Sequence, residues 1–315
     1  MVDLATIPPP PAARTGWPWT EQTPPAPERM PDEQPWPRVT IVTPSYNQGR
    51  FIEETIRSVL LQGYPNLEYI IMDGGSTDNS VEVIRKYERW LTSWASEKDR
   101  GQSHAINKGF ARATGEVFGW LNSDDYLLPG ALHRLMALRR LNPPALLWVG
   151  AWVEVEHTGR ILRRTLPRLG TKEDLGFWGR KTSFAQPACL FSAEAFRSVG
   201  GLDERYHFAM DIDLWMKLRA KGPFAGTGQD IATVRIYPEI KTLRDPVGRD
   251  AEFIAACFEH GLPEQARERL REHVAAETAR LQQYRESYEI IMGKPAVRLY
   301  MRLRDWLRRS KRRDR

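Results

Sequence analysis

Acidic residues at the ends of apolar runs are the first candidates for chemistry. Asp124 and Asp125 follow such a run in WLNSDDYLLPG. Adjacent carboxylates at a partly buried strand end repel each other, so one would stay protonated unless a cation lies beside them. Mg²⁺ or Mn²⁺ is often held by one or two carboxylates together with ligand phosphates. The pair therefore indicates a metal-assisted diphosphate site, and the alternative is a solvated turn ahead of Pro129 and Gly130.

Asp73 ends a second apolar run, in IIMDGGSTD. Its carboxylate could accept a hydrogen bond from the N–H of a planar base, while Gly74 and Gly75 let the backbone approach a ligand. The alternative is a turn aspartate that caps the next helix, a role that suits Asp78 better. We therefore expect Asp73 at the ligand and Asp78 at the helix.

Asp211 is the third acid, in HFAMDIDLWMKL. If a helix starts here, Asp211 shares a face with Trp215 and Leu218, whereas Asp213 does not. Burial among apolar side chains would raise the pKa of Asp211 and make it a usable general base. A place in the first turn of the helix would instead lower that pKa. The local sequence leaves both interpretations open.

Alternating strands and helices must position these acids. The segments RVTIVTPS, LEYIIMD, GEVFGWL, ALLWVGAWVEV and IATVRIYP are typical of strands, and FIEETIRSVLLQ, VEVIRKYERWL and GALHRLMALRRL of amphipathic helices. This alternation predicts an α/β fold with a Rossmann-like, mainly parallel sheet and helices on both faces. Ligands of such sheets bind beyond the carboxyl ends of the strands, where Asp73 and Asp124 fall.

Composition narrows the class of protein. The 315 residues are 41% hydrophobic, which is enough for a substantial core. No run approaches the roughly 18 apolar residues of a membrane span, and the N-terminus lacks a basic stretch followed by an apolar segment. We therefore expect a cytoplasmic protein. Cys189 and Cys257 have no CxxC spacing, so they are expected to be small core residues.

The ends of the chain differ from its middle. Residues 1–37 hold eleven of the 23 prolines, which predicts an extended or disordered arm. Residues 38–245 form the predicted α/β domain. Residues 246–292 are expected to be a charged helical extension, which could mediate assembly into a homo-oligomer. Residues 293–315 are expected to form a basic amphipathic helix.

Charge is concentrated in this tail. Residues 294–315 carry ten Lys or Arg against two Asp, a net +8, which leaves −2 for the rest of a chain whose total is +6. A nearly neutral body argues against nucleic-acid binding. The tail suits anionic lipid headgroups, so we expect peripheral attachment to the inner face of the plasma membrane, with a solvated tail as the alternative.

From about Arg38 to Leu218 the chain resembles the inverting family-2 glycosyltransferases of the GT-A fold. The resemblance rests on VTIVTPSYNQGRFIEETIRSVLLQ, EYIIMDGGSTDNS, SEKDRGQSHAINKGFARATGE, FGWLNSDD and GGLDERYHFAMDIDLWMKL, in this order. It implies transfer of a sugar from a nucleotide-sugar, with a UDP-sugar favoured, to a saccharide or lipid-linked acceptor. It also implies Mn²⁺ or Mg²⁺ as the cofactor and a role in cell-surface polysaccharide or glycolipid assembly.

The resemblance further implies roles for single residues. Asp211 would be the catalytic base and Asp124 the metal ligand. The nucleotide-sugar pocket would include Pro44, Ser45, Tyr46, Asn47, Asp73, Gly74, Gly75, Arg100, Asn122 and Ser123, with Asp99, Asn107, Asp125 and His207 as further candidates. The chain departs from the family pattern twice. Asn122 replaces the first acid of the Asp-x-Asp motif, and Gly74 stands where many members have a second Asp.

Two other functions stay open at this point. A nucleotidyltransferase would also use a nucleotide-binding sheet and a cation, but it would normally need a basic, Gly-rich phosphate loop after the first strand. The segment TPSYNQGR is poor in Gly and its only cation is Arg50. A non-catalytic nucleotide-sugar-binding scaffold at the membrane is the other alternative.

Overall fold

A computed structural model describes residues 2–294, without the side chains of residues 242, 243 and 291–293. The chain divides into two compact units, Met1–Ala266 and Arg267–Arg315. The first unit runs beyond residue 245, the last residue of the predicted α/β domain. Almost all of the predicted tail helix over 293–315 lies outside the described residues.

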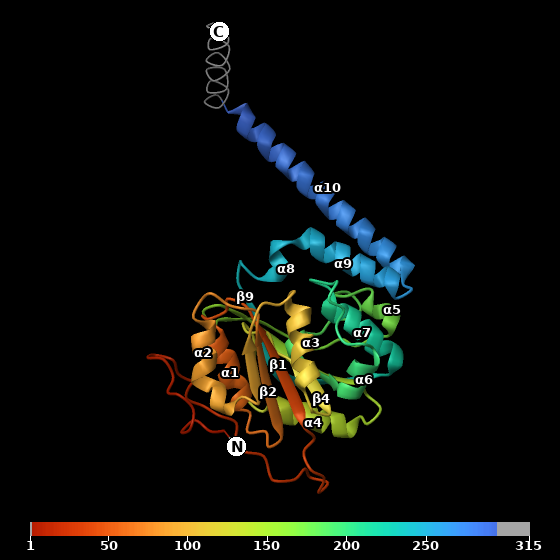
Figure 1. The fold of residues 1–315 in the computed structure, drawn as a ribbon. Coiled ribbons are helices and arrows are strands. Elements are labelled where there is room, and N and C mark those ends of the chain that lie inside the picture. The colour runs from red at the N-terminus through yellow and green to blue at the C-terminus, as the bar shows by residue number, and fades with distance from the viewer. Residues whose placement is uncertain (1, 295–315) are drawn as a thin grey trace. The chain divides into compact units, whose positions relative to one another are not determined.

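One sheet of nine strands forms the centre of the first unit in the described part of the chain (Figure 1). The strands are β1 (Val39–Ser45), β2 (Leu67–Asp73), β3 (Ser93–Ser96), β4 (Val117–Trp120), β5 (Tyr126–Leu127), β6 (Leu147–Glu156), β7 (Ile161–Thr165), β8 (Cys189–Ser192) and β9 (Phe224–Ile236). Their order is β3-β2-β1-β4-β8-β6-β9-β5, with β7 paired to β6. Strands β1 to β4 pair in parallel, as do β6 and β9, whereas β8, β5 and β7 pair antiparallel.

Helices flank this sheet (Figure 1). The helices of the described residues are α1 (Ile52–Leu60), α2 (Ser80–Tyr87), α3 (Gln102–Arg112), α4 (Ala131–Leu141), α5 (Lys172–Leu175), α6 (Ala193–Ser198), α7 (Met210–Lys221), α8 (Lys241–Arg244), α9 (Pro246–Glu259) and α10 (Pro263–Gly293), with short 3₁₀ turns at Glu88–Trp90 and Gln186–Ala188. The α/β fold with a mainly parallel sheet and a helical C-terminal part is confirmed. The four strands without a sequence prediction, β3, β5, β7 and β8, have at most five residues each.

The first strand–helix repeats follow directly from the sequence pattern. Every residue of β1 is buried, as expected for a β-branched strand covered on both faces. In α1, Ile52, Ile56 and Val59 recur at helical spacing and are buried. Gly109 lets α3 approach the sheet, because a Cβ there would lie 2.5 Å from Cγ1 of Val42.

The N-terminal arm is packed rather than disordered. The described residues of the arm form no helix or strand, as their prolines predict, but Ile7 and Trp19 are buried. The buried Arg57 of α1 holds the arm, since its guanidinium donates to the carbonyls of Pro8, Pro18 and Trp19 at 2.8–3.0 Å. The five donors of a buried arginine need such acceptors. Proline content alone therefore did not predict the order of this arm.

Helix α9 belongs to the first unit because it packs against α7. Phe253, Ala256 and Cys257 are buried. At the end of α9, His260 Nε2 lies 2.8 Å from Oδ1 of Asp213, which is also buried. Cys189 is buried as well, as expected of a small core residue. The contacts of α9 make it part of the first unit, which therefore extends beyond residue 245.

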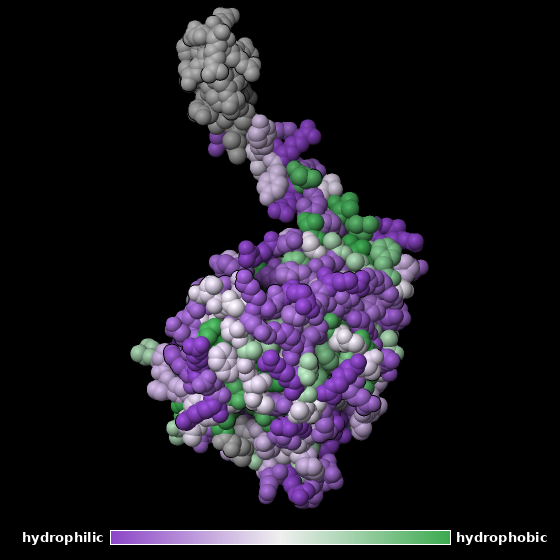
Figure 2. Space-filling model, viewed as in Figure 1, coloured by the Kyte–Doolittle hydropathy of each residue, from purple (hydrophilic) through white to green (hydrophobic). Residues whose placement is uncertain are grey.

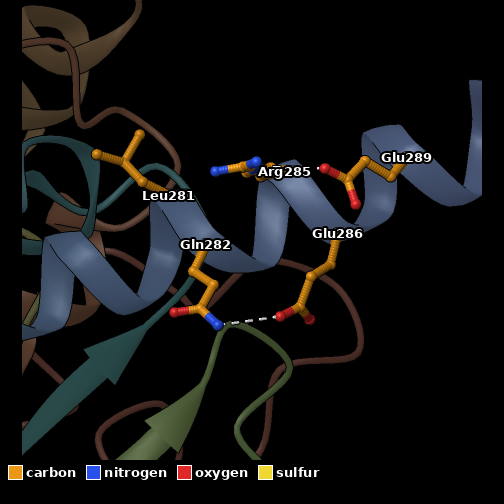
Figure 3. A pocket seen from close by; sticks show the side chains of 5 residues that line it. All are labelled: Leu281, Gln282, Arg285, Glu286 and Glu289. Atoms are coloured by element: carbon orange, nitrogen blue, oxygen red, sulfur yellow. Dashed lines mark hydrogen bonds and ion pairs between the residues drawn. The ribbon is translucent and has the colours of Figure 1, made fainter.

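The described part of the second unit is helix α10. Its exposed apolar side chains recur at spacings of three, four or seven residues at Leu270, Val274, Leu281, Tyr284 and Tyr288. Figure 2 shows hydrophobic residues among hydrophilic ones along this helix. A shallow hollow on it is lined by Leu281, Gln282, Arg285, Glu286 and Glu289, whose polar members pair one turn apart (Figure 3). No residue predicted for the site lies there, and no described helix is both long and apolar enough to cross a membrane.

Candidate functional site

Three parallel strands bring their carboxyl ends to one edge of the sheet. Ser45, the last residue of β1, pairs with Asp73, the last of β2. Val42 of β1 pairs with Trp120, the last residue of β4. The turns that follow these strands carry the predicted nucleotide-sugar and metal residues. Their common edge is where ligands bind in sheets of this kind.

The turn after β1 combines a buried hydroxyl with an exposed ring. Pro44 and Ser45 are buried, and the Ser45 hydroxyl has no hydrogen-bond partner among the described residues. Tyr46 is 62% exposed. Asn47 has a φ of +52° and its side chain accepts from the Thr77 N–H at 2.8 Å, so it locks the turn against the next one. A ligand at this turn would meet the Ser45 hydroxyl and the Tyr46 ring.

Asp73 organises its own turn. It is buried, and its two oxygens accept from the N–H groups of Gly75 and Ser76 and from the hydroxyls of Ser76 and Ser96, at 2.5–3.1 Å. A carboxylate has about four lone-pair sites, so these four donors nearly saturate it. The structure thus uses Asp73 first to shape the turn, and direct contact with a base stays a prediction. Asp78 holds the start of α2 as expected, since it accepts from Ser80.

Asp99 fills the space beside Gly74. A Cβ at position 74 would lie 2.7 Å from Oδ2 of Asp99. Asp99 is half-buried, and its other oxygen accepts from the Gly101 N–H. An acid at position 74 would therefore require the Asp99 side chain to shift and would place two carboxylates side by side. Gly75 has a φ of +82°, which accounts for a glycine at that position.

The repulsion between Asp124 and Asp125 is partly relieved by a cation of the protein itself. Asp125 is buried, and burial together with the charge of Asp124 raises its pKa. Arg235 opposes this rise, because its backbone N–H donates to Asp125 at 2.9 Å and its guanidinium is close by. That guanidinium is also buried and pairs with Glu54 at 2.9 Å. The adjacency of the two acids is therefore not by itself evidence for a cation.

Asp124, in contrast, is half-buried and lies at the outer side of the turn. Its Oδ2 accepts from the Tyr237 hydroxyl at 2.7 Å, and Tyr237 also contacts Gln48. Asn122 accepts from Gln102 Nε2 at 2.7 Å, and Gln102 Oε1 accepts from Lys241 at 3.2 Å. Hydrogen bonds thus connect this turn to the starts of α3 and α8.

Asp211 lies in the first turn of α7. Its Oδ1 accepts from the Ile212 N–H at 2.8 Å. Burial nevertheless raises the pKa of Asp211 to about 6, against the effect of this bond and of Lys241. Burial likewise lowers the pKa of Lys241 to about 8, opposed by the charge of Asp211. A raised pKa is the direction that a general base needs, and the base role of Asp211 stays a prediction.

Aromatic packing fixes α7 against the end of β4. The rings of Trp120 and Trp215 stack with centroids 5.6 Å apart and planes at 14°. Trp120 comes two residues before Asn122, and Trp215 is one helical turn after Asp211. Both rings are fully buried. This stack and the Asn122–Gln102–Lys241 chain connect Asp211 to the turn that carries Asp124.

Of four other predicted residues, two have contacts with the Gly-Gly-Leu-Asp-Glu loop over residues 200–204. Asn107 exchanges two hydrogen bonds with the backbone of Leu202, which fixes the Gly-Gly-Leu-Asp-Glu loop. Arg100 pairs with Glu204 at the surface. Ser123 is buried. His207 is exposed and lies four residues before Asp211.

The site offers one carboxylate to a metal ion. Among the described residues, no cluster of three or more His, Cys, Asp or Glu side chains is arranged to hold a metal. Oδ2 of Asp124 accepts from Tyr237, which leaves Oδ1 of Asp124 for a metal ion. The side-chain Oδ1 of Asn122 accepts from Gln102. This set fits Mg²⁺ or Mn²⁺ shared with the phosphates of a ligand and does not fit an all-protein metal cage.

Five residues at the site were not predicted from the sequence: Gln102, Arg235, Tyr237, Lys241 and Glu252. Gln102 lies within a segment that carries the family resemblance, and its position at the start of a helix could have identified it. The other four follow residue 230, in a region where the sequence offered only a strand and charged helices. Their hydrogen bonds span 34 to 189 residues along the chain, which local patterns do not encode.

The glycosyl transferase family 2 model matches residues 40–200, half of the chain. An uncharacterized glycosyltransferase of Nostoc sp. is 36% identical over 102 residues, 31% of this chain and 32% of that protein. Chondroitin synthase of Escherichia coli is 27% identical over 194 residues, 60% of this chain and 27% of its own length. The chain thus spans less than a third of either relative.

Two solved structures share the fold. Staphylococcus aureus TarS in complex with UDP-GlcNAc aligns with a TM-score of 0.58 and 16% identity, covering 72% of this chain and 66% of that one. The Pyrobaculum calidifontis mannosyltransferase PcManGT, in complex with GDP-Man and Mn²⁺, aligns with a TM-score of 0.52 and 18% identity, covering 86% and 85%. With its GT-A fold and the match over residues 40–200, the chain belongs to glycosyl transferase family 2.

Proposed function

We propose that this chain is an inverting glycosyltransferase that moves a sugar from a nucleoside diphosphate sugar to an acceptor hydroxyl. The observation that supports this most is the connection of two acids of different character. Asp124 is partly exposed beyond β4, and Asp211 is an acid of raised pKa at the start of α7. The Trp120–Trp215 stack and Gln102 tie their two elements together.

Asp211 would act as the general base. With a pKa of about 6, it is mostly ionised at neutral pH yet retains enough proton affinity to take the proton of an attacking hydroxyl. Attack on the anomeric carbon from the side opposite the diphosphate forms the new bond as the bond to the diphosphate breaks. A single displacement of this kind inverts the anomeric configuration and needs no covalent intermediate.

Asp124 would hold the cation at the donor end. Mn²⁺ or Mg²⁺ bound there would stabilise the charge that develops on the leaving diphosphate. Tyr237 keeps the Asp124 carboxylate oriented through its 2.7 Å hydrogen bond. The Ser45 hydroxyl, the Tyr46 ring and Asn122 would contact the nucleotide-sugar, and Asp73 would place the glycine turn beside it. Asp99, which occupies the space next to Gly74, would face the same part of the ligand.

Donor and acceptor are proposed by class. TarS is seen with UDP-GlcNAc and PcManGT with GDP-Man, so either a uridine or a guanosine donor is consistent with the fold, and we favour a UDP-sugar. The relationship to chondroitin synthase supports a role in polysaccharide assembly, with a saccharide or lipid-linked acceptor. We further propose that the protein works at the inner membrane surface. The basic tail that would attach it there lies outside the described residues.

A thermal-shift screen of UDP, GDP, dTDP and CDP, with and without Mn²⁺, tests the donor site. A ligand that binds only the folded state raises the Tm, and at a given concentration a tighter ligand raises it further. One nucleotide should raise the Tm further with Mn²⁺, and Asp124→Asn should lose the Mn²⁺-dependent part. Asp230→Asn, at an exposed pair with Arg164, is the control and should respond as wild type. If no nucleotide shifts the Tm, the proposed donor site is wrong.

A further inference from the structure

A carboxylate from outside the family match holds the segment that leads into Asp211. Glu252, in α9, accepts the backbone N–H groups of three consecutive residues: His207 at 3.0 Å, Phe208 at 2.5 Å and Ala209 at 3.0 Å. One oxygen takes the first N–H and the other takes the second and third. Consecutive amide groups seldom converge on a single side chain unless the backbone is wrapped around it.

These contacts complete the N-terminus of α7. Ala209 is the N-cap residue of α7, and its side chain cannot accept a hydrogen bond. In a capping box, a glutamate within the helix accepts the N-cap N–H. Glu252 makes the same contact from a different helix, and its negative charge is favourable at the positive end of the α7 dipole. Asp211 is only two residues further along.

The same segment is held from other sides. Lys241 Nζ donates to the His207 carbonyl and to Gln102, which connects it to Asn122. Helix α9 is itself anchored to α7, because buried Asp213 of α7 contacts His260 at the end of α9. Glu252 therefore has a fixed base from which to orient the start of α7.

We propose that Glu252 is a positioning residue for Asp211, acting through the backbone of residues 207–209. This inference rests on the proposed function, in which Asp211 must lie within hydrogen-bond reach of the acceptor hydroxyl. A displacement of about 1 Å at a reacting group can lower a rate by roughly 100-fold. Without Glu252, three amide groups lose their acceptor and the start of α7 is free to shift. The turn that carries Asp124 does not depend on these bonds.

The test compares Glu252→Ala and Glu252→Gln with Glu259→Ala. Glu259 lies in the same helix, is exposed and pairs with Arg205, so it controls for loss of a carboxylate from α9. Glu252→Ala should lower kcat by roughly 10- to 100-fold and leave the donor KM within about twofold of wild type. Glu252→Gln keeps one acceptor oxygen and should fall between Glu252→Ala and wild type. Glu259→Ala should match wild type.

Hydrogen exchange gives a second readout that needs no turnover. Amides of residues 207–209 should exchange faster in both Glu252 variants, and those of β1 should not. The inference is overturned if these amides exchange as in wild type, or if Glu252→Ala retains the kcat of Glu259→Ala. If Glu252→Ala does not fold, Glu252→Gln decides by the same two measurements. A wild-type protein without any transfer would overturn the proposed function, while hydrogen exchange would still report on the Glu252 contacts.

Discussion

Replacing Asp211 with Asn should abolish sugar transfer and, at neutral pH, stabilise the folded protein. Burial raises the pKa of Asp211 from 3.8 to about 6. An acid whose pKa is higher in the folded state binds its proton more tightly there, so its contribution to stability is complete below pH 4 and is lost as the pH rises through 6. Asn carries no charge and avoids that loss. The stabilisation by Asp211→Asn should therefore grow with pH.

The size of the effect follows from the two pKa values. Linkage gives a ceiling of about 3 kcal/mol at pH 7.5 and about 1 kcal/mol at pH 4.5. Partial exposure of Asp211 reduces both values, so we expect a gain of about 1–3 kcal/mol at pH 7.5. Urea unfolding followed by tryptophan fluorescence at the two pH values measures this difference.

Asp213→Asn is the matched control, two residues along the same helix. Asp213 is buried and contacts Lys217 at 2.6 Å and His260 at 2.8 Å. Loss of its charge should destabilise the protein by roughly 3 kcal/mol, because a buried pair is broken from one side. The two substitutions should thus change stability in opposite directions. If Asp211→Asn is no more stable than wild type at pH 7.5, burial does not raise the pKa of Asp211 as described above.

Three further substitutions test separate parts of the site. Arg235→Met leaves Glu54 and Asp125 without their buried cation and should lower the free energy of unfolding in urea by roughly 3–5 kcal/mol. Arg164→Met, at an exposed pair, should change it by less than about 1 kcal/mol, and equal effects would contradict the role of Arg235. Gly74→Asp should lower stability by roughly 1–3 kcal/mol because its Cβ would lie 2.7 Å from Asp99, and Asp99→Ala should recover part of the loss; no recovery would exclude that clash. Lys241→Met removes a charge that lowers the pKa of Asp211, so the acid limb of kcat/KM against pH should have its midpoint above 6, and a midpoint at or below 6 would argue against the pairing.

The sequence predicted the fold and the edge of the sheet that carries the site. Strands of β-branched residues that alternate with amphipathic helices specify a parallel sheet, and parallel strands place their carboxyl ends together. Ser45, Asp73 and Asn122 accordingly lie at or just beyond the ends of neighbouring parallel strands. The order of residues 1–37 could not be predicted, because their prolines say nothing about Arg57 and its three carbonyl acceptors.

The electrostatic details depended on partners distant in the chain. The sequence showed two adjacent acids, but the structure showed that Arg235, 110 residues away, already supports Asp125. It likewise left the pKa of Asp211 open, because burial and helix capping act in opposite directions and only packing decides between them. Glu252 carried no recognisable motif, since its contacts are to backbone amide groups. Such contacts leave no pattern in a single sequence.

Incubation of the purified full chain with a sugar donor, Mn²⁺ and a saccharide acceptor tests the proposed chemistry most directly. Release of nucleoside diphosphate and the anomeric configuration of the product are followed by ¹H NMR. The geometry predicts that wild type forms a product of inverted configuration. The rate of its formation should fall by roughly 100-fold or more in Asp211→Asn. A product of retained configuration, or an Asp211→Asn variant as active as wild type, would contradict a single displacement with Asp211 as the base.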